Sequence, residues 1–433
     1  MSILFQILLS FPLSGAEKDA SPTMESWMEQ LNQKPMEVPS HIGTLDELQV
    51  LAAQRNADLR AQYADWQGNL EKTRSIPGLP DPTLGLGYYL EPIETAQGPQ
   101  SAKLSLGQTI PWFSKIRSDR KGSHFHAIQS FEMLQTLRLS LERNIDKLWA
   151  EAWQIQSLTS IIEAKLTLSK DLEKVLQIQY QSAAISHKKL FEVQIQSLQL
   201  ENKLQDLQSR YQRLMVHLGD FLEDNAALPE DFLPAISLTI QDLETDSGVS
   251  PNHPRLTRFE ASKNEAGADI ESAQAAFIPD IKIGLDYIFT DQRVVNGVIV
   301  EDSGKDPLIV SAGLALPLWN WKSKRSAVRS SEWKFKKAQA LHDAEMNRLS
   351  QEYEIAQSML AEQLRNIYLY EDQLIPKAQE IESVMQQEYI SQSSDVFSYT
   401  MAKQQVLDLK LALVNAKYFA QLQMAELRYL KGN

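Results

Sequence analysis

The stretch Leu104–Lys115, LSLGQTIPWFSK, combines two kinds of pattern within a few residues. Up to Ile110, apolar residues alternate with small or polar ones, which is the period expected of a strand with one apolar face. Pro111 then stops ladder pairing. From there to Ser182 the chain contains no proline and almost no glycine, so a helix could run for roughly 100 Å. The stretch therefore predicts a strand that turns directly into a very long helix.

The same alternation occurs in three other segments, which predicts four strands at about 82–91, 102–111, 279–291 and 306–317. Each is close to the length of a tilted transmembrane strand. A water-soluble β-sandwich would show the same alternation, so the pattern alone leaves both readings open. The residues at one end of the strands favour the membrane, because an interfacial aromatic belt would lie there. The predicted belt residues are Trp112, Phe113, Trp319 and Trp321. The opposite ends, 91–100 and 290–306, are polar and are predicted to be loops, the second with a hairpin at Asn296-Gly297.

Self-comparison indicates that the chain is duplicated. Leu79–Gly87 resembles Phe277–Gly284, and Leu104–Trp112 matches Val310–Leu318. Each half then has the order helix, strand, strand, long helix, turn, helix. The predicted divisions are a signal peptide (1–16), a lead-in (17–43), a first repeat (44–218), a linker (219–251) and a second repeat (252–433).

The first residues have the character of an export signal. The apolar run Ile3–Leu9 is followed by the small residues Ser14–Ala16, which resembles a secretory signal peptide cut near Ala16, although its basic flank is missing. A buried N-terminal segment is the alternative. No other stretch approaches the roughly 18 apolar residues that a membrane helix needs. If the chain crosses a bilayer, we expect it to do so as strands.

Composition excludes several classes of protein. The 433 residues include 56 acidic and 43 basic ones, giving a net charge of −13, and no cysteine. We see no basic stripe that could neutralise nucleic-acid phosphates, which argues against nucleic-acid binding. The lack of cysteine excludes disulfides and thiolate metal sites within this chain.

The long helices carry heptad-like apolar spacing, which predicts coiled-coil seams. In the first repeat the seam residues are Leu134, Leu141, Ile145, Leu148, Ala152, Ile155, Ile162 and Leu166, followed after the turn by Leu200, Leu204, Leu207, Tyr211, Leu214 and Leu218. Pro376 lies inside the second long helix and should kink it.

Four membrane strands cannot close a barrel, and open edges are not tolerated in lipid. The smallest transmembrane barrels need about eight strands. If the strands span a membrane, several chains must therefore contribute to one barrel, with a long cylinder of helices continuing from it.

Over nearly all of residues 44–430, the sequence resembles the TolC-type outer-membrane efflux proteins. The motifs that carry the resemblance are Leu79–Pro82, Leu104–Lys115, Pro279-Asp280, Leu316–Trp319, and the paired Tyr180 and Tyr389 before the helical turns. The resemblance implies a mainly α-helical fold: a homotrimer with a twelve-stranded outer-membrane β-barrel on a periplasmic α-helical tunnel. It also implies a periplasmic adaptor and an inner-membrane transporter as partners, in a tripartite pump or type I secretion system, without a cofactor. The motifs are closest to the branch that serves resistance-nodulation-division pumps, including heavy-metal exporters.

The resemblance also places a periplasmic entrance and adaptor-docking tips at the two helical turns. The candidate residues are Ala183, Ser186, Glu192, Gln392, Asp395, Ser398 and Met401. Relatives usually have glycine where this chain has Ala183 and Gln392, and often an aspartate pair where it has Ser398 and Met401. The nearest acids here are Glu192 and Asp395. In the barrel lumen, Lys282 and Asp286 share a strand face and are predicted to form an ion pair.

No pattern indicates an enzyme or a metal centre. His124 and His126 are two apart on a predicted helix and face different directions. Met24, Met28 and Met36 lie in the unpatterned lead-in, and no nucleophile elbow, phosphate loop or zinc motif is present. We therefore expect a passive exit duct, with a periplasmic coiled-coil adaptor or scaffold as the alternative. The sequence leaves the cargo open among drugs, metal cations and polypeptides.

Overall fold

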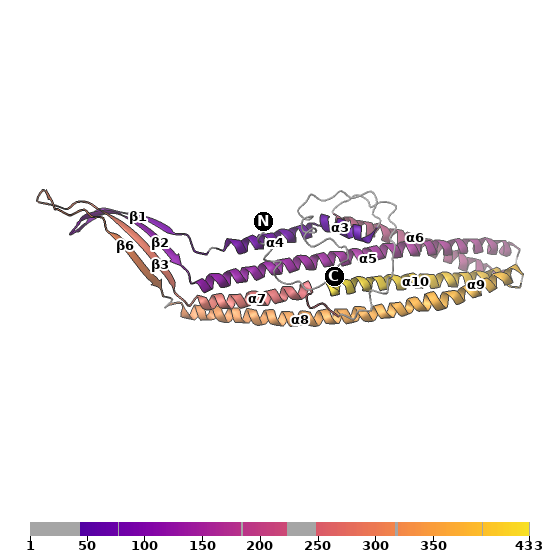
Figure 1. Ribbon diagram of the computed structural model, residues 1–433. Helices are drawn as coiled ribbons and strands as arrows, with labels where there is room; N and C mark the ends of the chain where they lie inside the picture. The colour runs from indigo at the N-terminus through magenta and orange to yellow at the C-terminus, as the bar shows by residue number, and fades with distance from the viewer. Residues whose placement is uncertain are drawn as a thin grey trace.

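A computed structural model describes residues 44–76, 78–182, 185–222, 248–316, 319–391 and 393–432. The chain is elongated, with a β-sheet at one end and long, roughly parallel helices over the rest of its length (Figure 1). The elements are α3 (Leu45–Arg55), α4 (Ala57–Ser75), β1 (Thr83–Thr95), β2 (Gly98–Ile110), α5 (Phe113–Gln181), α6 (His187–Leu222), α7 (Pro254–Ala275), β3 (Asp280–Thr290), β4 (Val294–Val295), β5 (Val298–Ile299), β6 (Leu308–Ala315), α8 (Trp321–Tyr368), a π-helical segment (Leu369–Leu374), α9 (Ile375–Ile390) and α10 (Val396–Lys431).

The four long strands form one antiparallel sheet in the order β1-β2-β3-β6. Strands from the two halves of the sequence meet at its centre, where Leu106 of β2 lies opposite Leu285 of β3. Strands β1 and β6 form the edges, and each pairs on one side only within the part of the chain that the structure describes. The sheet is therefore open, and it leaves two ladders of backbone groups available for pairing.

One predicted loop is wrong. Residues 91–100 were expected to be a polar loop, but β1 continues to Thr95 and β2 begins at Gly98. Pairing shifts register between Tyr88 and Ile93 and then continues as far as the pair Thr95 and Gly98. Polar side chains do not prevent a ladder, because strand pairing uses backbone groups.

The loop between β3 and β6 contains the small hairpin β4–β5, as the Asn296-Gly297 pair predicts. Both turn residues have positive φ, 53° and 83°, which is the conformation that a two-residue type I′ turn requires. The loop is fastened to the β1–β2 turn, where the Gly304 amide donates to the Gln97 carbonyl over 2.7 Å. This end of the sheet therefore carries a ribbon that projects beyond the main strands (Figure 1).

The predicted seams form the core of the helical half. Leu141, Ile145 and Ile155 of α5 are buried against Leu207 and Leu214 of α6, in a cluster that also includes α3 and α4. A second cluster joins α5, α7, α8 and α10. Helix α10 packs against both α5 and α8, so helices from the two halves of the chain share one layer. None of the helices in the described ranges combines the length and the apolar character that crossing a membrane would require.

The predicted interruption at Pro376 takes the form of a π-helical segment. Pro376 has no N–H to donate to the carbonyl four residues earlier. Just before it, over Leu369–Leu374, the helix widens, and the Ile375 amide donates to the Tyr370 carbonyl five residues back. The wider turn allows α9 to continue the line of α8, as Figure 1 shows.

Several predicted segments lie outside the described residues. They are the signal peptide (1–16), the lead-in (17–43) with its three methionines, and most of the linker (219–251).

Candidate functional site

The sheet has one continuous apolar face. In the register of the strands, Leu84, Leu106, Leu285 and Val310 form one row across all four strands. The adjacent row contains Leu86, Leu104, Tyr287 and Leu308. These side chains are exposed or half-buried in the single chain, with Leu86 at 79% and Val310 at 74%. A soluble monomer rarely leaves so large an apolar surface in water, so this face requires a partner or a lipid environment.

The opposite face carries small and polar side chains. Thr83, Gly107, Gly284 and Ser311 form one row across the sheet. A Cβ atom at Gly284 would lie 2.5 Å from the Ser311 hydroxyl, so a larger residue there would force that hydroxyl to rotate away. The two faces differ as the alternation in the sequence predicts.

The predicted ion pair between Lys282 and Asp286 is wrong. Asp286 pairs instead with Lys103 of the neighbouring strand, at 3.1 Å between the ammonium nitrogen and the carboxylate oxygen. Two residues four apart on one strand are separated by about 13 Å, whereas cross-strand neighbours are about 5–8 Å apart. Lys103 could not be identified before the β2–β3 pairing was known, because it lies in the other half of the chain.

The four predicted belt residues lie where the sheet joins the helices. Trp112 precedes α5 and Phe113 begins it, while Trp319 and Trp321 lie at the start of α8. All four are exposed, and Trp319 reaches 92%. Trp321 also makes an edge-on contact with Phe277, which lies between α7 and β3; the two ring centroids are 4.8 Å apart. The aromatic residues thus border the apolar face of the sheet at its helical end.

The two helical turns lie together at the end of the molecule remote from the sheet (Figure 1). A buried cluster of Leu172, Leu176, Leu190 and Val193, from α5 and α6, packs against Val396 and Phe397 at the start of α10. The Lys189 ammonium also lies 5.4 Å from the centre of the Phe397 ring. The tips of the two halves therefore form one unit rather than two independent hairpins.

The structure gives a local environment to most of the predicted entrance residues. Ala183 and Gln392 lie outside the described residues. Ser186 accepts a backbone hydrogen bond from Lys189, and Glu192 makes an exposed ion pair with Lys188 at 3.6 Å. Met401, which is 48% exposed, and Ser398 line a cavity of about 640 Å³ between α9 and α10, together with Tyr370, Ile381, Met385 and Asp408. The two predicted acids lie on different elements, Glu192 on α6 and Asp395 before α10.

Asp395 is the N-cap of α10. Its carboxylate accepts a hydrogen bond from the Ser398 amide over 2.7 Å. This bond and the Ser398 hydroxyl lower the pKa of Asp395, and the nearby Lys189 also contributes. Because folding lowers the pKa of Asp395, this carboxylate stabilises the folded protein at pH values above its pKa in the unfolded chain. The stabilisation is lost as the pH falls through its pKa in the folded protein.

Asp395→Ala should lower the free energy of unfolding of the tip by about 1 kcal/mol, because the first turn of α10 loses its cap. Hydrogen exchange at the amides of residues 396–400 would measure the effect. Asp395→Asn keeps a capping oxygen and serves as the control. Equal acceleration in both variants would show that capping is not what Asp395 contributes.

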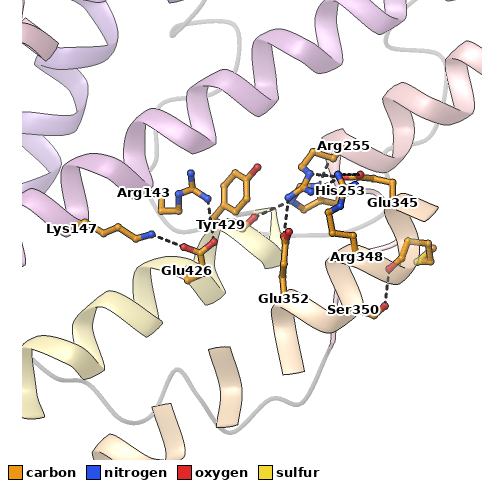
Figure 2. Close-up of polar contacts among 11 residues, drawn as sticks. Arg143, Lys147, His253, Arg255, Glu345, Arg348, Ser350, Glu352, Glu426 and Tyr429 are labelled. Atoms are coloured by element: carbon orange, nitrogen blue, oxygen red, sulfur yellow. Dashed lines mark hydrogen bonds and ion pairs between the residues drawn. The ribbon is translucent and has the colours of Figure 1, made fainter. Parts of the chain in front are cut away.

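A polar network surrounds the end of α10, near the middle of the molecule (Figure 1), and contacts the first half of the chain through Arg143 and Lys147 (Figure 2). His253 is fully buried and caps α7, where its Nδ1 accepts from the Arg255 amide and its Nε2 donates to the Tyr429 carbonyl over 3.0 Å. Burial lowers the pKa of His253, so the ring is neutral at this junction. Arg255 in turn binds the buried carboxylate of Glu345 and the partly exposed one of Glu352. No pattern in the sequence indicates this network, since Pro254 marks only the start of α7.

Arg143 of α5 reaches the same region from the first half. Its guanidinium carbon lies 4.2 Å from the centre of the Tyr429 ring, and it pairs with Glu426, which also binds Lys147 (Figure 2). The end of α10 is therefore held by α5 on one side and by α7 on the other.

Another carboxyl in this region, that of Glu132, titrates near neutral pH. Burial raises the pKa of Glu132 to about 7, partly offset by a hydrogen bond from Thr257. The pKa of Glu132 is thus higher in the folded protein than in the unfolded chain. The contribution of Glu132 to the free energy of unfolding is therefore present at low pH and is lost as the pH rises through about 7.

Glu132→Gln should therefore raise the midpoint of thermal unfolding at pH 8 relative to the unmodified protein, while the two should converge near pH 5. Glu163→Gln, at an exposed carboxyl on the same helix, is the matched control and should leave the pH profile unchanged. If the unfolding midpoint of Glu132→Gln depends on pH in the same way as that of the unmodified protein, the raised pKa of Glu132 is contradicted.

The residues considered for metal binding do not converge. His126 Nδ1 lies 3.2 Å from the Glu265 carboxylate, whereas the His124 ring lies against Phe125. Within the described ranges, no group of three or more histidine or acidic side chains is arranged to hold a metal ion.

Comparison with known proteins agrees with this geometry. Residues 249–433 match the family of outer membrane efflux proteins. VceC of Vibrio cholerae has the same fold, with a TM-score of 0.71 and 18% identity over 90% of this chain and 96% of that one. For CmeC of Campylobacter jejuni the TM-score is 0.69 and the identity 13%, over 97% of this chain and 90% of that one. For CusC the TM-score is 0.73 and the identity 14%, over 96% of this chain and 99% of that one. No curated protein matches the sequence.

The resemblance to the TolC-type outer-membrane efflux proteins is thereby confirmed. Residues 249–433 are similar in sequence to outer membrane efflux proteins, and over most of its length the chain has the mainly helical fold of VceC and CusC.

Proposed function

We propose that this chain is one of three identical subunits of an outer-membrane exit duct for efflux, and that it is not an enzyme. In this assembly the sheets of three copies close a twelve-stranded barrel, and the helices continue as a tunnel in the periplasm. The duct conducts passively, and a pump in the inner membrane supplies the energy.

The observation that carries the proposal is the two-faced sheet with open edges. Its exposed apolar rows, such as Leu84 to Val310, suit contact with lipid, and its polar face suits a water-filled lumen. The backbone groups of sheet edges in lipid must be paired. If β6 of one copy lay beside β1 of the next, the free N–H and C=O groups of both edge strands would be hydrogen-bonded. The belt residues Trp112 and Trp319 border the apolar face at the level expected of a membrane interface.

The remote tips suit docking to a periplasmic adaptor. They carry exposed apolar side chains on both halves, including Phe191, Ile195 and Ile390. The tunnel entrance would lie there, near residues 183–195 and 392–404, and would open by an iris-like movement of the helix pairs. VceC is described as an outer membrane protein, CmeC as an outer membrane channel and CusC as a transmembrane channel, which supports a channel function for this fold.

Two measurements test the proposal. Detergent-solubilised protein should have the mass of three chains and form discrete conducting units in a planar bilayer. Recovery as a soluble monomer without detergent would instead favour the coiled-coil scaffold. Charge reversal at Glu192 or Asp395 should change conductance or ion selectivity, and unchanged values for both variants would place the constriction elsewhere.

A further inference from the structure

Basic residues are concentrated where each long helix leaves the sheet. Phe113–Lys121, the start of α5, contains four lysines or arginines and one aspartate. Trp321–Arg329, the start of α8, contains four and no acid. The whole chain has a net charge of −13, so this end of the helical half has the opposite sign to the rest of the protein. The expectation from the sequence, that no basic stripe is present, is therefore wrong for this end of the helices.

Most of these cations form no ion pair with a described residue. Lys121 pairs with Glu271, Lys324 donates to the Ala276 carbonyl, and Arg120 donates to the Ile76 carbonyl. Four others are exposed and form no ion pair with any described residue. We call this set the basic collar; it consists of Arg117, Lys322, Arg325 and Arg329.

The α8 part of the basic collar lies on the side of the helix turned away from its neighbour α7. Lys322, Arg325 and Arg329 are spaced by three and four residues and so form one stripe. Ser331 and Ala338, on the other side of the helix, are buried against α7. The stripe is therefore available to a partner from outside this chain.

The depth of the basic collar matches a layer of lipid headgroups. An α-helix rises 1.5 Å per residue, so Arg117 and Lys322–Arg325 lie within about 8 Å of the nearest belt residue. The headgroup layer on one side of a bilayer is about 5–8 Å thick. Arg329 lies about 12 Å from Trp321 along the axis, and its long side chain can extend toward the interface.

We propose that the basic collar binds the phosphate groups of anionic phospholipids in the leaflet adjoining the helical half. The inference rests on the proposed membrane position of the sheet. Basic clusters beside a membrane-spanning segment attract anionic lipids, by about fivefold for each cation near the surface. Because the attraction is electrostatic, it weakens as salt is added.

Native mass spectrometry of the full-length, detergent-solubilised protein provides the test, with phosphatidylglycerol and phosphatidylcholine as separate probes. We expect the protein to bind phosphatidylglycerol at least about tenfold more tightly at low salt. The triple variant K322Q/R325Q/R329Q should lose most of this preference. The matched control K174Q/K188Q/K203Q removes three exposed cations from the remote half and should retain it.

Three results would overturn the proposal. They are equal binding of the two lipids by the unmodified protein, an unchanged preference in K322Q/R325Q/R329Q, and complete competition by inorganic phosphate at matched ionic strength. If the triple variant instead loses the three-chain mass, the stripe binds a sister subunit and not lipid. Single-channel recording of the same samples separates this from the proposed function: conduction without lipid preference refutes the basic collar alone, whereas a lack of conduction refutes both.

Discussion

Arg255→Ala is expected to lower the free energy of unfolding by about 3 kcal/mol or more, because it removes one partner of a buried ion pair. Arg255 approaches Glu345 at 2.5 Å, and the Glu345 side chain is only 6% exposed. Without Arg255 the carboxylate stays buried with a single remaining partner, Arg348, at 3.1 Å. The same change also removes the bond to Glu352, so α7 and α8 lose two connections. Thermal or denaturant unfolding of the purified protein would measure the loss.

Arg348→Ala is the matched control, since it removes a cation from the same carboxylate. Its side chain is 63% exposed, and exposed ion pairs contribute only about 0–1 kcal/mol. Arg255→Ala should therefore be several-fold more damaging than Arg348→Ala. Similar losses in the two variants would show that the burial of the Arg255–Glu345 pair is not what stabilises the junction.

Leu106→Arg is expected to prevent stable membrane insertion, because it places a charge at the centre of the apolar face. Leu106 lies in the row from Leu84 to Val310, and an arginine near the middle of a bilayer costs a β-barrel about 2–4 kcal/mol. We expect a large fall in the fraction of protein that floats with lipid vesicles after reconstitution.

Ser105→Arg provides the control on the other face of the same strand. Ser105 lies opposite Asp286 in the register, so an arginine there would have an acidic neighbour and a water-filled lumen. This variant should insert almost as well as the unmodified protein. Equal failure of the two variants would contradict the assignment of one face to lipid and the other to water.

Some of the local structure followed directly from short patterns in the sequence. The alternation before Pro111 gave β2, and the proline-free stretch after it gave α5, which ends at Gln181. Asn296-Gly297 predicted the small hairpin, and Pro376 predicted an interruption of the second long helix. Such features depend on backbone conformation and on the period of apolar residues, both of which are local properties.

Features that join distant parts of the chain did not follow from the sequence. The predicted Lys282–Asp286 pair failed because Lys103 lies closer across the sheet. The buried network around His253 combines residues from α7, α8 and α10, and no spacing in the sequence indicates that they meet. The basic collar also depends on the sheet, which brings the starts of α5 and α8 to the same end of the molecule (Figure 1).

The sequence by itself determined most of the helices and strands of this protein and the two faces of its strands, because periodicity and proline position act over a few residues. The tertiary structure decided which strands are neighbours and which edges stay open. It also decided which charges lie buried in pairs and which remain without a partner. These properties depend on contacts between residues that are distant in the sequence, such as Leu106 with Leu285 and Arg143 with Glu426, where burial and distance set the energy of each pair.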